Sequence, residues 1–269
     1  MTALHVGMVH LSDFRLDSRI QRQATALAQR GDTVELVCLG ERDELRVGRG
    51  LIRVHPVAMR KPGGGAGAYL RGYAEFLIRA AARLGMLERR RHFDVVEVHN
   101  MPDALTLAAV LPKLRGAPVI LNLHDTFPEL LASKFDRPPD GWGVRALRLE
   151  ERLSAGLADR LVTVTNQARA RLAARGVGRG RTDIVMNSPD EGVFGPARAP
   201  IELPAEGAVR VLYHGGTARR YGVETLICAF GPLAADKPHL SLRICGTGEE
   251  LPALAKLASE VAPGRAEVV

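Results

Sequence analysis

The sequence has few aromatic residues, few cysteines and no long hydrophobic run. Aromatic residues make up 4% of its 269 residues, and no apolar run approaches the roughly 18 residues of a membrane-spanning helix. The three cysteines, Cys38, Cys228 and Cys245, lie far apart within apolar stretches. This spacing excludes a clustered cysteine metal site and a C-x-x-C redox pair, and it is typical of a reducing cytoplasm.

Several targeting and binding motifs are also missing. The amino terminus lacks the basic segment of a signal peptide, so we expect a cytoplasmic protein. Neither glycine turn has the pattern G-x-G-x-x-G. After the turn at 245–250, Leu251 stands where the pattern requires its last glycine. No H-x-x-x-H pair or carboxylate cluster indicates a metal site, and no nucleic-acid motif is present. We therefore expect no metal, no cofactor and no nucleic-acid partner.

The charge of the chain is strongly basic. The formal net charge is +7, and 32 of the 37 basic residues are arginine. A basic surface attracts nucleic acid, anionic membranes or phosphorylated substrates. Because nucleic-acid motifs are absent, the composition favours the last two.

Strand-like and helix-like segments alternate along the chain. This alternation predicts an α/β fold with parallel sheets and helices on both faces. A segment rich in proline and glycine predicts a linker at 187–208, between Rossmann-like domains at 1–186 and 209–269, with the second ending after its third strand. The predicted strands are 4–10, 33–39, 51–58, 94–99, 117–123, 160–165, 209–214, 240–245 and a last one in "AEVV". The predicted helices are 18–30, 68–91, 102–115, 143–156, 166–176, 220–234 and 249–261.

Histidines stand at the carboxyl ends of four predicted strands: His10, His99, His124 and His214. In open parallel sheets, ligands bind beyond these strand ends. The alternation and the histidines together predict a ligand-binding cleft between the two domains.

The segment "HDTFPE" at 124–129 contains two kinds of signal. Thr126 and Glu129 have the spacing of a capping box, with Pro128 in the first helical turn. Capping does not explain His124 and Asp125. They are either catalytic residues facing the cleft or part of a turn whose aspartate binds local backbone.

Two further strand ends carry candidate acceptor-binding residues. In "HLSDFRLDSRIQ", Asp17 or Ser18 is the expected helix cap, which leaves Ser12, Asp13 and Arg15 free to bind a polyhydroxylated ligand. In "HNMPDAL", Pro102 begins a helix, and His99 and Asn100 remain at the strand end.

The second domain carries the candidate donor-binding residues. In "YHGGTARRYG", Gly215 and Gly216 let the backbone approach a ligand, and Arg219 and Arg220 add charge beside a helix amino terminus. Diphosphate binding follows from this combination. A solvated glycine turn is the alternative. Gly246, in "CGTGEE", is a weaker candidate at the next strand end.

The helix at 68–91 has two different faces. Tyr73, Leu77, Leu84 and Leu87 share one face, and Arg71, Arg79, Arg83 and Arg90 lie on the other. This is either a packed helix with a solvated basic side or a helix that docks on an anionic membrane.

The sequence resembles bacterial family-4 glycosyltransferases of GT-B fold. The resemblance rests on "VVEVHNMPDALTLAAVLPKLRGAPVILNLHDTFPELLASKF" at 95–135, with support from "DSRIQRQATALAQRGDTVELV", "VLYHGGTARRYGVETLICAF" and "LSLRICGTGEEL". It implies metal-free transfer of a sugar from a nucleotide-sugar donor, with retention of configuration. It places the acceptor on the first domain and the donor on the second.

By position, the resemblance also assigns roles to residues. His124 corresponds to a histidine near the transferred sugar, and Gly215, Gly216 and Arg220 to the phosphate-binding turn. Tyr221 stands where the family often has lysine, so Arg219 or Arg220 would supply the charge. The family's E-x7-E motif is absent from the sequence, so the resemblance implies that it lies beyond Val269 and that residues 1–269 alone transfer little sugar.

The resemblance therefore predicts a glycosyltransferase of cell-envelope or exopolysaccharide synthesis. Its acceptor would be a glycan or a lipid-linked molecule, and it would work in the cytoplasm or at the inner face of the plasma membrane. The alternatives are a non-catalytic sugar- or nucleotide-binding remnant and a sugar-nucleotide epimerase of the same fold.

Overall fold

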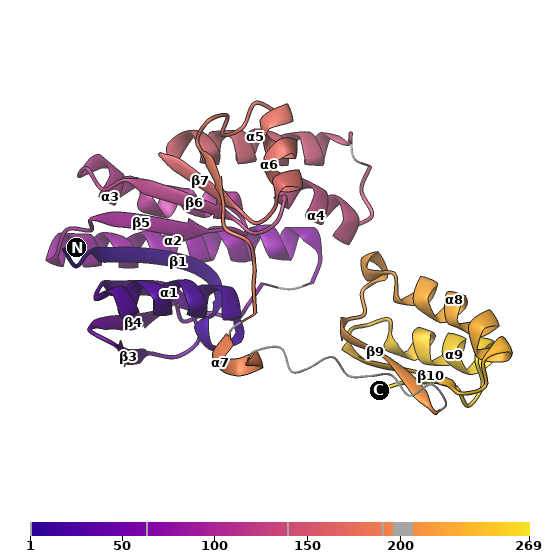
Figure 1. Cartoon of the computed structure of the whole chain (residues 1–269). Coiled ribbons are helices and arrows are strands. Elements are labelled where there is room, and N and C mark those ends of the chain that lie inside the picture. Colours follow the sequence, from indigo (N-terminus) through magenta and orange to yellow (C-terminus); the bar gives the residue numbers. More distant parts are fainter. Residues whose placement is uncertain (1, 63, 139, 190, 196–206) are drawn as a thin grey trace. The chain divides into compact units, whose positions relative to one another are not determined.

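A computed structural model describes residues 2–62, 64–138, 140–189, 191–195 and 207–269. The chain divides into two compact units, Met1–Gly195 and Pro196–Val269 (Figure 1). Each unit is built on a sheet whose strands are mainly parallel and alternate with helices. The predicted α/β class is confirmed. Much of the predicted linker lies outside the described residues.

The first unit contains an eight-stranded sheet in the order β3-β4-β2-β1-β5-β6-β7-β8. Every neighbouring pair is parallel except β3 with β4. The sequence analysis missed β3 and β8, and it ended β1 three residues early. The strands are β1 (His5–Asp13), β2 (Thr33–Leu39), β3 (Asp43–Val47), β4 (Gly50–Pro56), β5 (Val95–His99), β6 (Val119–Leu123), β7 (Arg160–Thr163) and β8 (Thr182–Ile184).

The helices of the first unit mostly match their predicted ranges, with one correction. The helix predicted at 102–115 is a 3-10 helix followed by a short α-helix, with Pro112 in the first turn of the latter, where no N–H donor is required. The helices are η1 (Phe14–Leu16), α1 (Ser18–Arg30), α2 (Ala66–Arg90), η2 (Asp103–Ala109), α3 (Val110–Leu114), α4 (Phe127–Lys134), α5 (Trp142–Leu157), α6 (Asn166–Ala174) and α7 (Glu191–Phe194).

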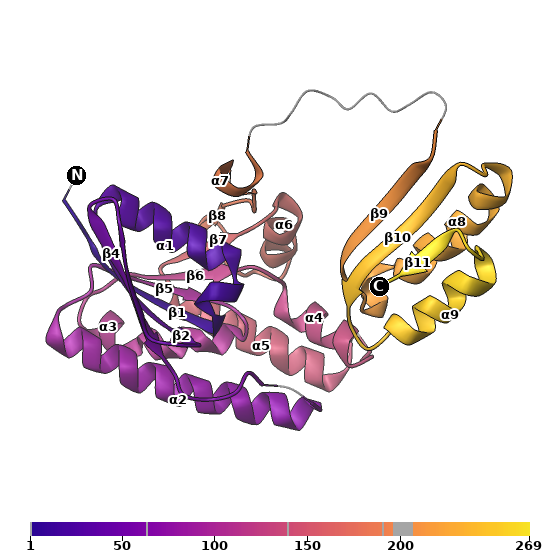
Figure 2. The same ribbon diagram turned by 90° about the horizontal axis from the view of Figure 1, so that it is seen from below.

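Two hydrophobic cores cover the two faces of this sheet. Val34 and Leu36 of β2 pack in the core that includes α1, and Val37 and Leu39 pack in the core that includes α2. This alternation follows the two-residue period of a strand. Figure 2 shows α1 and α2 on opposite sides of the sheet.

Helix α2 has the two faces that its sequence predicted. Leu84 and Leu87 are buried in the core, Tyr73 and Leu77 pack against it, and the arginines lie on the more exposed side. Among the described residues, no helix combines the length and the apolar composition needed to cross a bilayer.

The second unit has a three-stranded parallel sheet in the order β11-β10-β9. Val223, Ile227 and Phe230 of α8 pack on this sheet together with Leu254 and Ala258 of α9. Within the described residues β9 is an edge strand, and its Leu212 is 59% exposed. The elements are β9 (Val209–Gly216), η3 (Arg219–Tyr221), α8 (Val223–Asp236), β10 (Leu240–Thr247), α9 (Leu251–Val261) and β11 (Ala266–Val268).

Candidate active site

Three histidines meet at the carboxyl ends of the central strands in the first unit. His10 lies on β1, His99 ends β5, and His124 follows β6. The rings of His99 and His124 are stacked with centroids 5.3 Å apart, and His10 packs edge-on against both. His99 Nδ1 and His124 Nε2 are 3.1 Å apart. The cluster lies where the strand order reverses between β1 and β5, the usual ligand-binding position of such sheets.

A carboxylate anchors the cluster to the amino terminus of α1. Asp17 Oδ2 lies 3.1 Å from His10 Nε2, and both carboxylate oxygens accept hydrogen bonds from the Arg19 guanidinium. Asp17 also caps α1, as predicted, by accepting from the backbone N–H of Arg19. Burial alone would raise the pKa of Asp17, but the hydrogen bonds from His10 and Arg19 outweigh it and lower the pKa. The aspartate therefore stays ionised and fixes the His10 ring.

Asn100 connects the turns that follow β5 and β6. Its side-chain oxygen accepts from the backbone N–H of His124 at 2.9 Å, and its amide donates to the Asp125 carbonyl at 2.8 Å and to Asp103 Oδ1 at 2.9 Å. The turn that contains Asn100 has two successive cis peptide bonds, Asn100–Met101 and Met101–Pro102. The hydrogen bonds of the Asn100 side chain hold the turn of His124 beside the end of β5, where His99 lies.

Two rings of the cluster, those of His99 and His124, are poor bases. Burial lowers the pKa of His124 to about 3, with Arg19 and His10 adding to the shift. Burial also lowers the pKa of His99 well below its usual value. Both rings are therefore neutral at pH 7. Among the described residues, His10 Nδ1, His99 Nε2 and His124 Nδ1 have no hydrogen-bond partner, so the site holds buried ring nitrogens suited to hydroxyl groups.

Not every predicted residue belongs to this cluster. His99 and Asn100 contact His124, whereas the Asp125 side chain points to solvent. Asp13 caps η1, and the Arg15 guanidinium pairs with Glu41 and Asp43. Among the described residues, Ser12, Asp13 and Arg15 form no hydrogen bond or ion pair with the histidines, and Ser12 and Asp13 lie within β1 rather than in a loop after it. Arg15 is thus engaged in ion pairs rather than free as predicted.

Helix α4 begins after Thr126 with Pro128 in its first turn, as predicted, but the predicted capping-box hydrogen bonds are not formed. Thr126 precedes α4 but makes no side-chain capping bond. The Glu129 carboxylate instead pairs with Arg175, which also holds Glu151 of α5 at 2.9 Å. The sequence analysis missed this network because its members lie far apart in the chain.

The glycine-containing ends of β9 and β10 lie side by side in the second unit. Gly215 pairs with Gly246 in the parallel register of β9 and β10, and Gly216 pairs with Thr247. A Cβ on Gly246 would lie 2.6 Å from the Gly215 carbonyl oxygen, so only glycine fits without a shift. The analysis missed Thr217, which is buried between these turns and whose hydroxyl has no partner among the described residues.

The two arginines lie just before the helix rather than in it. Arg219 and Arg220 form η3, and α8 begins at Val223 instead of at residue 220. Both are exposed, and the Arg220 guanidinium carbon lies 4.7 Å from the centroid of the Tyr221 ring. Within the described part of the chain neither forms an ion pair. Their charges are therefore available to an anionic ligand.

Comparison with known proteins gives both a family and a fold. Residues 16–188 match the glycosyl transferase 4-like domain. The chain resembles α,α-trehalose 6-phosphate synthase from Burkholderia multivorans, with a TM-score of 0.61 and 15% identity over 100% of this chain and 73% of that one. It also resembles the lipopolysaccharide outer core galactosyltransferase WaaB, with a TM-score of 0.59 and 9% identity over 98% and 67% of the two chains.

Some similar structures belong to another class of enzyme, the UDP-N-acetylglucosamine 2-epimerases. A putative UDP-N-acetylglucosamine 2-epimerase from Listeria monocytogenes has a TM-score of 0.53 and 14% identity, over 100% of this chain and 69% of that one. No curated protein matches the sequence. At these identities the structures show the GT-B fold, while the family rests on the domain match.

Proposed function

The chain belongs to the glycosyl transferase 4-like family, and from that premise we propose that it transfers a sugar from a nucleotide sugar to an acceptor with retention of configuration. The family supports sugar transfer in general. The observation that carries the proposal further is the buried histidine cluster at the strand ends of a chain from that family. Retention and the substrates are part of the proposal.

In this proposal His124 positions the transferred sugar. Its ring is neutral at pH 7 because burial lowers its pKa to about 3, so it serves as a hydrogen-bond partner for a sugar hydroxyl and not as a general acid. An oriented hydroxyl lowers the entropic part of the barrier. His99 and Asn100 hold the ring in place through the contacts described above.

The turn at Gly215 is the proposed site of the donor diphosphate. When the bond between the anomeric carbon and the phosphate oxygen breaks, the leaving diphosphate takes the electron pair and gains negative charge. The acceptor hydroxyl oxygen bonds to the anomeric carbon on the same face, and its proton passes to an oxygen of the leaving phosphate. Exposed guanidinium groups at Arg219 and Arg220 and the backbone N–H groups of a glycine turn stabilise that charge. Thr217 adds a hydroxyl whose oxygen has no partner in the described residues.

The proposed acceptor is a glycan or a lipid-linked molecule of envelope or exopolysaccharide synthesis. It would bind on the first unit, near the histidines. The basic side of α2 is the proposed contact with an anionic membrane, since its arginines face away from the core.

A transfer assay tests this function. The purified chain is incubated with a panel of nucleotide sugars and acceptors, and nucleoside diphosphate release and products are measured. Because the E-x7-E motif is absent from residues 1–269, we expect only slow transfer by the wild type. We expect a further loss of about 10²-fold in His124→Asn and an unchanged rate in the control His239→Asn, which alters an exposed residue. Full activity in His124→Asn would contradict the assigned role. An isomerised nucleotide sugar formed without acceptor would identify an epimerase instead.

A further inference from the structure

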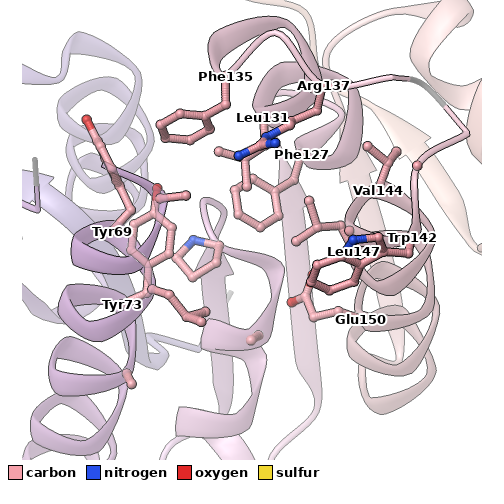
Figure 3. Close-up of a pocket in the computed structure, with 18 of the residues that line it drawn as sticks. Tyr69, Tyr73, Phe127, Leu131, Phe135, Arg137, Trp142, Val144, Leu147 and Glu150 are labelled. Carbon is pink, nitrogen blue, oxygen red and sulfur yellow. The ribbon is translucent and has the colours of Figure 1, made fainter. Parts of the chain in front are cut away.

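An apolar groove opens in the first unit between helices α2, α4 and α5. Its volume is about 740 Å³, within the range of small-molecule sites. Figure 3 shows Tyr69 and Tyr73 on one side, Phe127, Leu131 and Phe135 on the next, and Trp142 and Leu147 on the third. The sequence analysis missed this groove because its walls come from three separate segments.

The side chains of the groove leave a large apolar surface open to solvent. Trp142 is 87% exposed and Leu70 is 71% exposed, although both line the groove. Isolated exposed apolar residues are common, but a continuous apolar hollow of this size marks a binding site. A hydrocarbon ligand would remove this surface from water.

Two turns of the chain line the groove and also carry residues of the histidine site. Pro102, which lines the groove, follows Asn100 by two residues, and Phe127 follows His124 by three. The Asn100 amide, bonded to the Asp125 carbonyl, ties these two turns together. The groove therefore lies on the same two turns that carry the histidine site.

The charged groups at the groove favour an anionic head group. Arg137 lines the groove, and Lys134 Nζ lies 4.2 Å from the centroid of the Tyr69 ring. Within the described residues neither forms an ion pair. The carboxyl group of the lining belongs to Glu150, and burial raises its pKa to about 7, so it opposes an anion less than an exposed glutamate would.

We infer that the groove binds the hydrocarbon chain of an amphiphilic acceptor that carries an anionic head group. The role as acceptor rests on the proposed sugar transfer; the binding itself does not. The ligand is one molecule with a single long apolar chain, held with its head group near Arg137 and Lys134, the cations at the groove.

The single tryptophan of the chain provides the readout, because Trp142 lies at the groove. Hexyl, octyl and decyl phosphate are titrated below their micelle concentrations while Trp142 emission is followed. We expect a blue shift as the chain covers the indole. Each added methylene should tighten binding by up to about fourfold until the groove is full.

A matched pair of variants separates the groove from the rest of α2. Leu70→Glu places a charge in the lining, and Ile78→Glu places the same charge two turns further along, at a residue that is 69% exposed and outside the groove. We expect Leu70→Glu to weaken decyl phosphate binding at least about fivefold and Ile78→Glu less than about twofold. Both positions are exposed, so neither change threatens folding.

Three results would overturn the inference. These are affinity that does not depend on chain length, equal losses in the two variants, and an emission shift with anionic vesicles but not with monomeric alkyl phosphates. The last would make the groove part of a membrane-docking surface. Since no donor is present in the titration, its failure is separate from that of the proposed function. Alkyl phosphate binding without sugar transfer would refute only the proposed sugar-transfer function. Transfer to soluble acceptors without alkyl phosphate binding would refute only the proposed role of the groove.

Discussion

Strands β1 and β9 each carry a histidine near the carboxyl end, yet the surroundings of these two histidines are built by different means. His10 is buried, and its ring is held by Asp17 in a network of side chains. His214 is exposed, and the turn after it consists of glycines in close backbone contact. The first arrangement fixes side-chain atoms in space, and the second presents backbone to a ligand. In the proposed function these two arrangements would serve different tasks, the first orienting hydroxyl groups and the second binding phosphates.

The strongest test of this contrast is Asn100→Ala. It would remove three hydrogen bonds at once and leave the buried His124 N–H and Asp103 without partners. We expect the free energy of unfolding of the first unit to fall by about 3 kcal/mol, measured by urea denaturation. Asn166→Ala, which removes a surface contact on α6, is the control and should cost less than about 0.5 kcal/mol. Equal losses would show that the turn is not held by side chains.

Acid should weaken the first unit through His124. Its pKa is about 3 when folded and about 6.5 when unfolded, so the unfolded chain binds more protons between these values. Stability is therefore present above pH 6.5 and is lost as the pH falls toward 3, by roughly 3 kcal/mol at pH 4. Unfolding curves of the wild type and His124→Gln over this range provide the measurement, because the variant lacks this contribution. Parallel pH profiles would contradict a buried neutral ring.

The glycine turn should fail by steric overlap rather than by lost hydrogen bonds. The added carbon in Gly246→Ala would meet the Gly215 carbonyl and the Thr217 methyl group, each at 2.6 Å. We expect the second unit to lose about 2 kcal/mol. Gly156→Ala, on a helix with no atom within 4 Å of the new carbon, should be neutral or stabilising. A neutral result for Gly246→Ala would show that the two turns are not locked together.

The smallest effect on stability is expected at the arginines before α8. Replacing Arg219 and Arg220 with glutamine should change the free energy of unfolding by less than about 0.5 kcal/mol, because both are exposed and unpaired within the described residues. If they bind the diphosphate, affinity for UDP should still fall about tenfold, as measured by calorimetry. Arg210→Gln, on the exposed side of β9, is the control. An equal loss in both would indicate only a general charge effect.

The sequence predicted most of the fold because local patterns determine it. The range of β2 and the caps of α1 at Asp17 and Gly31 follow directly from hydrophobic runs and capping residues. Strand β3 escaped notice because its sequence, DELRV, is largely charged, and it pairs only at the edge of the sheet.

The site was predictable in part. Strand-end position identified His99, Asn100 and His124 because parallel strands bring their ends together. It gave no sign that Arg15 would be drawn to Glu41, or that Glu129 would bind Arg175 rather than cap its own helix. Such contacts depend on packing between distant segments. The groove was not predicted for the same reason, because its walls come from three helices that are separate in the sequence.

The Arg175 contact has a consequence for inheritance. One guanidinium, located just after α6, binds Glu129 of α4 and Glu151 of α5, the two helices that form walls of the groove. Loss of the arginine alone would leave the carboxylate of Glu151, which is almost fully buried, without its positively charged partner. Substitution of one of these three residues alone is therefore expected to destabilise the fold. Replacement of all three by neutral side chains leaves no charge without a partner. Among descendants of this gene, the three codons should change together or not at all.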